Sequence, residues 1–283
     1  MMFDVIAVAD GPRISLGVAL NIVVSRKTCP KARFCVALPE DARFESAVAE
    51  QCIREFAGSI VRIPSPKINV EGHLYRIENK VNAFQVVGTR RAILVDSDVL
   101  FLRPLPIDFL ERRVPAAVPE HSSEYSFPWA RMYATLGLVQ PTIKVLSGSG
   151  HTCDPWFNAG FVIAPNGEQL SSVWRMMCEF LLRCDWVPDR WPYLDQIALP
   201  LAFAQLSPTR SVGYDNVLPA RFNQNMFYWE KEQGHILSGF VAHHHNRVKL
   251  LETYFPHLIT WTADEYPVVR LILDELRQFD RDE

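Results

Sequence analysis

Two carboxylates follow an apolar run in the segment AILVDSDVLFL, residues 92–102. The run ends at Asp96, and Asp98 comes after a single serine. If the chain stays extended there, residues i and i+2 face the same way, so both carboxylates can reach one ligand. Carboxylate oxygens are ligands that Mg²⁺ and Mn²⁺ prefer, and both ions leave coordination positions for phosphate oxygens. The segment predicts a divalent-cation site, and a simple Asp-Ser turn is the alternative interpretation.

Three consecutive histidines near residue 245 offer further ligands for the same ion. His243, His244 and His245 follow the apolar stretch GFVA, which is typical of a strand. On a strand, His243 and His245 share a face and His244 points away. Neutral imidazoles and carboxylates together form a reasonable set of ligands for a divalent metal. We therefore expect one or two of these histidines in the metal site, and the sequence leaves open which ones.

An alternation of strands and helices positions these residues in the first hundred positions. Strands are expected at 3–10, 32–40, 59–66 and 92–98, and helices at 15–27, 41–58 with Asp41 as N-cap, and 73–88. Such alternation indicates an α/β fold whose mainly parallel, mixed central sheet is covered by helices on both faces. Ligands of open sheets bind beyond the carboxyl ends of the strands, where Asp10 and the Asp96/Asp98 pair both fall.

The second half of the chain is less regular. Strands are expected at 115–120 and 156–165, and helices at 129–138, 168–184, 193–206 and 263–279. Residues 121–155 are rich in Ser, Gly, Pro and aromatic residues and predict a partly mobile loop of the kind that covers substrates. Aromatic side chains at 125–133 and 226–229 suit stacking on sugars, and they suit a core equally well. No linker divides the chain, so we expect one domain with a nucleotide-binding half (1–100), an acceptor and sugar half (101–250) and a C-terminal helical segment (251–283).

Composition excludes several classes of function. The 283 residues carry a formal net charge of −3, which gives no basic footprint for a nucleic acid. No apolar run approaches the roughly 20 residues of a membrane span, and the N-terminus does not have the pattern of a signal peptide. The six cysteines are scattered without a CxxC pair, which predicts thiols rather than a zinc site in a reducing cytoplasm.

The segment AILVDSDVLFLRPL resembles the DxD segment of GT-A fold glycosyltransferases, in particular glycosyltransferase family 8, the glycogenin and galactosyltransferase-like group. Further segments are similar to family segments in the same order: RIENKVNAF, WFNAGFVIAP, YLDQIALPLAF, VLPARFNQN and VAHHHNRVKLL. The resemblance runs from the first strand to the histidines. In the last segment Lys249 follows His243 by six residues, as in the family's HxxGxxKPW pattern, whereas the residues between them and after the lysine differ from that pattern.

The resemblance implies a glycosyltransferase that takes a sugar from a nucleotide sugar, UDP-linked in our expectation, with retention and with Mn²⁺ or Mg²⁺. The scattered thiols and the N-terminus lead us to expect that it is cytoplasmic. Together with the residue types, it gives three groups of candidates. Metal ligands are expected at Asp96, Asp98, His243 and His245; donor contacts at Asp10, Lys80, Asp96, Ser97, Gly160 and Lys249; and catalytic residues at Asn158, Asp195 and Gln196. The acceptor can be a carbohydrate, a lipid or a protein.

Two alternative functions remain. Sugar nucleotidyltransferases use a similar sheet, but they carry a GxGxR-type loop after the first strand, and ADGPRISLG matches that loop poorly. A catalytically idle relative that only binds a sugar or a nucleotide is the other alternative. Nucleotide binding that depends on a metal would distinguish these cases.

Overall fold

The computed structural model describes the chain except for residues 1, 71, 121–124, 148–149, 227–238 and 282–283. The aromatic residues Phe227, Tyr228 and Trp229 lie outside the described residues. The chain forms two compact units. The first unit comprises residues 1–65, 95–110 and 221–283, and the second unit comprises residues 66–94 and 111–220. The hypothesis of a single domain with three parts stays a prediction.

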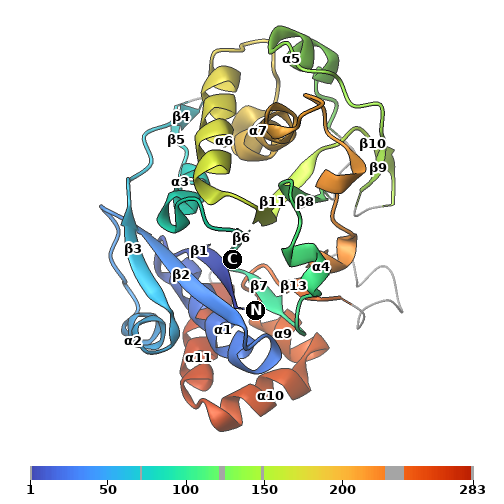
Figure 1. Cartoon of the computed structure of the whole chain (residues 1–283). Helices are drawn as coiled ribbons and strands as arrows, with labels where there is room; N and C mark the ends of the chain where they lie inside the picture. The colour runs from blue at the N-terminus through green and yellow to red at the C-terminus, as the bar shows by residue number, and fades with distance from the viewer. Residues whose placement is uncertain (1, 71, 121–124, 148–149, 227–238, 282–283) are drawn as a thin grey trace. The chain divides into compact units, whose positions relative to one another are not determined.

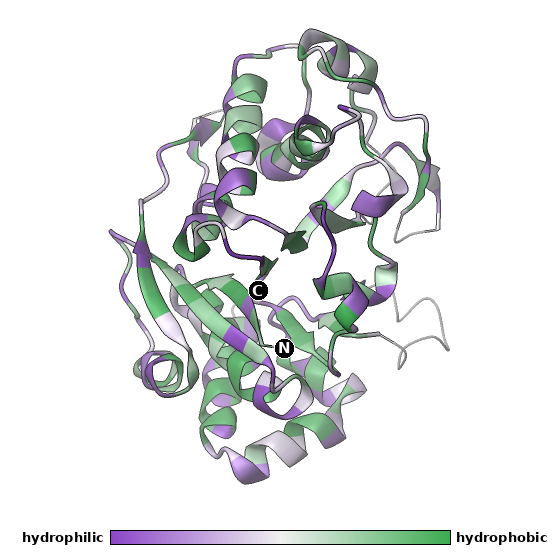
Figure 2. Cartoon of the chain, in the orientation of Figure 1, coloured by the Kyte–Doolittle hydropathy of each residue, from purple (hydrophilic) through white to green (hydrophobic). Residues whose placement is uncertain are grey.

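Three parallel strands form the sheet of the first unit, in the order β3-β2-β1. These are β1 (Phe3–Val8), β2 (Ala32–Pro39) and β3 (Ser59–Ile63), joined by the helices α1 (Pro12–Thr28) and α2 (Ala47–Phe56). The strands are rich in Val, Ile and Ala, and Figure 2 shows β1 and β2 as largely hydrophobic. The predicted strand–helix alternation is confirmed for this part of the chain (Figure 1).

Helix α2 begins later than the sequence suggests. The expected N-cap, Asp41, is wrong: Ser46 caps the helix, and its side chain accepts a hydrogen bond of 3.0 Å from the Ala49 N–H. Asp41 instead bonds to the Ser65 side chain, which donates to its carboxylate and accepts from its N–H. Residues 42–46 are not helical, and the Ser46 side chain satisfies one of the free N–H groups at the beginning of α2.

Helix α1 is buried along most of its length, since α2, α10 (Pro256–Glu265) and α11 (Val268–Arg281) pack around it. Figure 1 draws α10 and α11 in red next to α1. The expected single helix 263–279 is wrong, because the helical conformation is interrupted between α10 and α11 at Tyr266 and Pro267. Proline has no N–H to continue the hydrogen-bond ladder of α10, and the interruption separates the two helices.

The strand expected at 92–98 is shorter. Strand β6 (Ala92–Val95) ends before Asp96, residues 97 and 98 form a turn, and β7 (Val99–Phe101) follows. The chain is therefore not extended from Asp96 to Asp98, and the expectation that both carboxylates face the same way along one strand is wrong. In the first unit β7 pairs antiparallel with β13 (Val241–His243), which pairs in parallel with β12 (Gln224–Asn225). The described residues of this unit also form the short helices α4 (Ile107–Leu110) and α9 (Val248–Tyr254), with the 3₁₀ turn η3 (Ala220–Phe222) at its edge.

The second unit contains the antiparallel pair of β8 (Ala116–Pro119) and β11 (Phe157–Ala164), whose register shifts between Phe157 and Val162. Helix α7 (Arg190–Leu206) packs on β11 and on α6 (Gly167–Leu182). These elements confirm the expected ones with ends displaced by a few residues. The smaller elements are α5 (Trp129–Thr135), η2 (Tyr214–Asn216) and the hairpin of β9 (Val145–Leu146) and β10 (Thr152–Cys153).

The helix expected at 73–88 is only partly present. Residues 73 and 74, the first residues of the expected helix, instead form β5 (His73–Leu74), which pairs in a hairpin with β4 (Asn69–Val70). Gly72, with a φ of +88°, makes the turn possible, and its N–H donates to the Asn69 side chain. The helix itself is α3 (Glu78–Ala83), continued by the 3₁₀ turn η1 (Phe84–Val87).

Two further expectations concern the chain as a whole. All six cysteines are free thiols, as expected. Within the described residues, no helix is both long enough and apolar enough to cross a membrane.

Candidate active site

The short sheet of the first unit brings Asp98 and His243 together. Its register places His243 opposite Val99, and the His244 N–H donates to the Asp98 carbonyl oxygen at 2.8 Å. The side chains then meet, with His243 Nε2 2.9 Å from Asp98 Oδ2. The His243 ring stacks on the His245 ring, with 4.1 Å between centroids. Asp98, His243 and His245 each offer a ligand atom, and these atoms lie within 4.8 Å of one another. We call these three residues the Asp-His-His cluster.

The charge states of the Asp-His-His cluster suit a cation. Burial alone would raise the pKa of the Asp98 carboxyl group, but the charge and the hydrogen bond of His243 outweigh burial and lower that pKa. Burial lowers the pKa of His245 to about 3, with a further contribution from His243. At neutral pH the carboxylate is thus ionised and the His245 imidazole is neutral, and both are the forms in which these groups bind metals.

A left-handed turn, not a strand, places His245. Strand β13 ends at His243, so the expectation that His243 and His245 share a face of one strand is wrong. His245 and Asn246 have φ of +56° and +54°, a region that few residues other than glycine adopt and that Asn tolerates best. This turn brings the His245 ring back onto His243. The His244 ring is fully buried, and burial lowers its pKa to about 3.

Helix α1 contacts both turns of the cluster through Gly17. A Cβ atom at Gly17 would lie 2.2 Å from Asn246 Oδ1 and 2.5 Å from the Ser97 carbonyl oxygen. Only glycine lets the helix backbone approach the two turns this closely. Gly17 was not among the residues predicted from the sequence, although a glycine within a predicted helix is a signal of close packing.

The other first-unit candidates lie at the ends of elements. Asp10 follows β1 and is half-buried, beside Gly11 with its φ of +95°. Asp96 and Ser97 are also half-buried, and within the described residues neither belongs to the Asp-His-His cluster. Lys249 is exposed in the first turn of α9.

Helix α9 is held in place by the C-terminal helix. The Val248 N–H at its start donates to Asp280 Oδ2 of α11 at 3.0 Å. Asp280 also lies 3.7 Å from an Arg13 guanidinium nitrogen. The carboxylate therefore satisfies a free N–H at the beginning of the helix that carries Lys249.

In the second unit, Asn158 of β11 bridges two groups. Its Nδ2 donates to Glu120 Oε2 at 2.8 Å, and its Oδ1 accepts from the Gly160 N–H at 2.7 Å. The amide is thereby fixed next to a carboxylate at the end of β8. Glu120 was not among the residues predicted from the sequence, although an acid directly after an apolar strand is the same signal that identified Asp96 and Asp98.

Asp195 is an anchor of α7. It is 1% exposed, the Tyr75 hydroxyl donates to its Oδ1 at 2.6 Å, and its own N–H donates to Tyr75 Oη at 2.9 Å. Burial and the Asp195 charge raise the pKa of Tyr75, so the hydroxyl stays protonated. The next residue, Gln196, is half-buried, and its Oε1 has no hydrogen-bond partner within the described residues. Lys80 is half-buried on α3.

The α/β fold is that of GT-A glycosyltransferases. The galactosyltransferase LgtC, solved with donor and acceptor sugar analogues, has a TM-score of 0.54 and 15% identity over 86% of this chain and 87% of its own. GlyE of Streptococcus pneumoniae TIGR4 has a TM-score of 0.55 and 13% identity over 99% of this chain and 64% of its own. The bifunctional glycosyltransferase WbbM has a TM-score of 0.52 and 13% identity over 86% of this chain and 45% of its own. The expected fold class is confirmed.

The sequence itself identifies the family. Residues 5–207, more than half of the chain, match the Rhodobacterales glycosyltransferase domain, and the chain belongs to this family. It is a glycosyltransferase, as expected from its motifs. No curated protein sequence matches the chain. The matched residues include Asp98 and Asn158, whereas His243, His245 and Lys249 lie beyond them.

Proposed function

We propose that this glycosyltransferase takes its sugar from a UDP-sugar, requires Mn²⁺ and retains the anomeric configuration. The observation that carries the metal requirement is the Asp-His-His cluster, whose ligand atoms lie within 4.8 Å of one another. A relative of the same fold, LgtC, was solved with donor and acceptor sugar analogues, which supports a sugar donor here.

The cluster fits a divalent ion of intermediate character. It supplies one ionised carboxylate and imidazole nitrogens, of which His245 is neutral at pH 7. Mg²⁺ favours oxygen ligands alone, whereas Mn²⁺ accepts both oxygen and nitrogen, so we favour Mn²⁺. When bound, such an ion offsets the negative charge of a departing nucleoside diphosphate.

The remaining first-unit candidates bind the donor in this proposal. The exposed ammonium group of Lys249 is free to reach phosphate oxygens, and Asp280 holds its helix in place. Asp10 and Asp96, half-buried at the ends of β1 and β6, accept hydrogen bonds from hydroxyl groups of the ribose, and Ser97 offers a hydroxyl beside them.

The second-unit candidates bind sugar hydroxyl groups in this proposal. Asn158 is fixed beside Glu120, so the pair presents an amide and a carboxylate together, and Gly160, whose N–H donates to Asn158, stays a predicted donor contact. Lys80 of α3 stays a predicted contact of the donor. Gln196 contacts the substrate in this proposal, because it is half-buried with an Oε1 that lacks a partner within the described residues, whereas Asp195 is 1% exposed and bonds to Tyr75 through Oδ1. A second LgtC structure carries a glutamine-to-glutamate change in its active site, which supports a role for a glutamine.

Titration of UDP into the protein, with and without Mn²⁺, tests the proposal. We expect Mn²⁺ to strengthen UDP binding by roughly ten-fold or more, which corresponds to at least one strong electrostatic contact. Asp98→Ala and His245→Ala should abolish that gain. Asp264→Ala is the matched control, because Asp264 is an exposed carboxylate of α10 that pairs with the surface residue Arg270. A UDP affinity of the wild type that does not change with Mn²⁺, or an undiminished UDP affinity of Asp98→Ala in Mn²⁺, would contradict the metal requirement.

Two further measurements test the donor and the stereochemistry. Hydrolysis of a panel of UDP-sugars by the full chain identifies the donor sugar. The anomeric configuration of the first product, read from its ¹H coupling constant by NMR, distinguishes retention from inversion, and an inverted product would refute that part of the proposal.

A further inference from the structure

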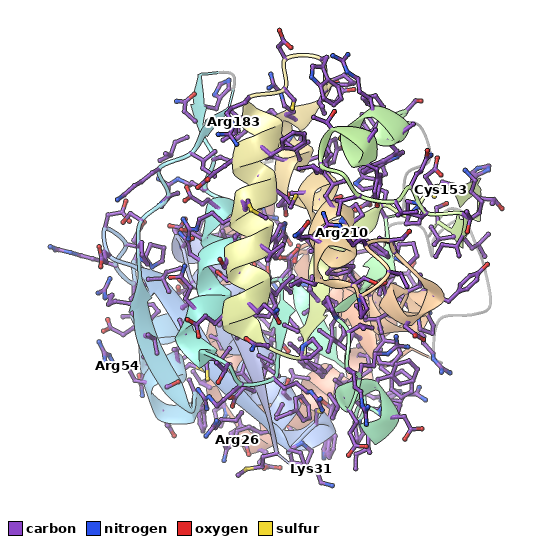
Figure 3. All side chains as sticks on the ribbon, turned by 45° about the horizontal axis from the view of Figure 1, so that its top comes forward. Arg26, Lys31, Arg54, Cys153, Arg183 and Arg210 are labelled. Atoms are coloured by element: carbon purple, nitrogen blue, oxygen red, sulfur yellow. The ribbon has the colours of Figure 1, made fainter. Side chains whose placement is uncertain are left out.

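A cavity of about 190 Å³ lies wholly within the second unit. Its aromatic lining comes from Tyr125, Phe127, Trp129 and Trp156, and its polar lining comes from Ser126, Lys144 and residues 152–154, at the end of the β9–β10 hairpin. Cys153, labelled in Figure 3, lies on this hairpin. The volume is below the 300–1,000 Å³ of pockets for drug-sized ligands, so the cavity suits a single ring.

The aromatic side of the cavity is rigid. Phe127, Trp129 and Trp156 are each less than 8% exposed and pack edge to face, with centroids 5.5 Å apart for Phe127–Trp129 and 5.2 Å for Phe127–Trp156. The half-buried Tyr125 adds a near-parallel contact with Phe127 at 6.2 Å. Mutually packed rings keep one orientation, so this surface is formed before a ligand arrives.

The polar side of the cavity is electrically balanced. Lys144 Nζ and Asp154 Oδ1 form an ion pair of 2.7 Å, and both residues line the cavity. Because the two charges cancel, the cavity gives no net attraction to an anion such as phosphate or to a cation. It offers instead a strong donor and a strong acceptor side by side, which suits a neutral ligand whose neighbouring hydroxyl groups both donate and accept.

The indole N–H of Trp156 is a buried hydrogen-bond donor next to the cavity. The Trp156 indole N–H is buried and makes no hydrogen bond in the part of the chain that the structure describes. Unsatisfied buried donors are costly and therefore uncommon. Because this nitrogen is itself buried, a ligand in the cavity binds through the rings and the ion pair rather than through the indole N–H.

The aromatic cluster also connects the cavity with the candidate site residues of the same unit. Trp156 directly precedes β11, which carries Asn158, and its ring contacts that of Tyr193 edge to face at 5.7 Å. Tyr193 and Tyr125 bring their hydroxyl oxygens within 3.3 Å, and Tyr193 stands two residues before Asp195.

We propose that this cavity binds one pyranose ring of a saccharide acceptor. The apolar C–H face of the ring packs on the aromatic side, and its hydroxyl groups bond to the Lys144–Asp154 pair. This inference rests on the proposed function in one respect, the role of the saccharide as acceptor; the binding of the ring stands on the cavity alone.

Saturation-transfer NMR with the full chain tests the binding directly. The probes are the methyl glycosides of glucose, galactose, mannose and N-acetylglucosamine, in both anomeric forms and without UDP or metal. We expect at least one to bind, with transfer strongest to the protons of one ring face. Lys144→Met and Asp154→Asn should each weaken binding roughly ten-fold, the effect of losing one hydrogen bond to a charged group.

Arg270→Met and Asp264→Asn are the matched controls, because these residues form an exposed ion pair of 3.0 Å in the first unit. Both should bind the glycoside as the wild type does. Absence of binding by every glycoside, or equal binding in Lys144→Met, Asp154→Asn and the wild type, would overturn the proposal. Displacement of the glycoside by adenosine or by indole would likewise overturn it, because the cavity would then select an aromatic ring.

The wild type is titrated separately with UDP and Mn²⁺. Glycoside binding that Lys144→Met weakens, in a chain that does not bind UDP, supports the saccharide cavity while the donor proposal fails. UDP binding without glycoside binding overturns the saccharide cavity and supports the donor proposal.

Discussion

Replacement of Gly17 by alanine tests whether helix α1 holds the two turns of the Asp-His-His cluster in place. The added Cβ would lie 2.5 Å from the Ser97 carbonyl oxygen, about 0.9 Å closer than the 3.4 Å at which ordinary contact begins. The Asn246 side chain can rotate away from the methyl group, but the Ser97 oxygen belongs to the backbone. The turn that carries Asp98, or the helix itself, must therefore move by nearly 1 Å.

Two opposing effects set the stability of the Gly17→Ala variant. Overpacking of this kind costs about 1–3 kcal/mol, and replacing a helical glycine by alanine returns roughly 0.5–1 kcal/mol. We expect a net loss of about 1 kcal/mol in the free energy of unfolding and a Tm lower by a few degrees. Mn²⁺-dependent UDP binding should suffer more, because ligand positions must hold within roughly 0.5 Å, and we expect a loss of about ten-fold or more.

Calorimetric titration and a thermal scan measure both effects in the Gly17→Ala variant. Gly213→Ala is the matched control, because a Cβ there meets nothing within 4 Å and the residue has an ordinary φ. A Gly17→Ala protein that keeps the wild-type UDP affinity would refute the reasoning, whether or not its Tm falls, because the turns would then tolerate the displacement.

Three further predictions concern buried and half-buried polar groups. Tyr75→Phe leaves the Asp195 carboxylate without the hydroxyl that donates to it, and urea unfolding should show a loss of about 1–3 kcal/mol. Asp280→Ala removes the acceptor for the first N–H of the helix that carries Lys249, so we expect a loss of about 1 kcal/mol and UDP binding weakened a few-fold in titrations with Mn²⁺. His244 has a folded-state pKa of about 3, below its unfolded value, so it contributes stability at neutral pH that is lost as the pH falls from about 6.5 towards 3. Urea unfolding at pH 7, 6 and 5 should therefore show a free energy of unfolding that falls, through this residue, by up to about 1.4 kcal/mol per pH unit. In His244→Leu the free energy of unfolding should depend less steeply on pH.

The first two of these predictions have a control in the same chain. Tyr214→Phe changes a tyrosine that is 69% exposed and should leave the stability unchanged. Asp274→Ala removes an exposed carboxylate of the helix that also carries Asp280, and it should leave UDP binding unchanged. A Tyr75→Phe protein as stable as the wild type, an Asp280→Ala protein with normal UDP affinity, or equal pH slopes for wild type and His244→Leu would each contradict the corresponding reasoning.

The regular elements of this fold could be predicted from the sequence because each one has its own local pattern. The apolar runs of β1, β2 and β3 are bounded by turn residues, and α1 and α6 have the length and composition of helices. The ends were less predictable where two signals compete. Both Asp41 and Ser46 are good N-cap residues, and only the backbone conformation decides that Ser46 caps α2.

The candidate site was predictable in its residue types and not in its geometry. Asp98, His243 and His245 were expected to converge, and they do, but through a turn and a left-handed conformation rather than along extended strands. The pairing of β7 with β13 involves three residues on each strand, too few for a periodicity to be read. Glu120 and Gly17 have local signals, an acid after an apolar strand and a glycine within a helix, but the partners that make them important are distant in the chain.

The pairing of β7 with β13 has a consequence for the order in which the protein folds. It joins residues 99–101 to residues 241–243, and closing such a long loop is entropically costly and slow. Asp98 and the histidines can therefore meet only after the histidines have been synthesised and the chain between residues 98 and 243 has become compact. Capture of a cation by this cluster would then mark the completion of folding, and a nascent chain that ends before residue 243 would lack the site altogether.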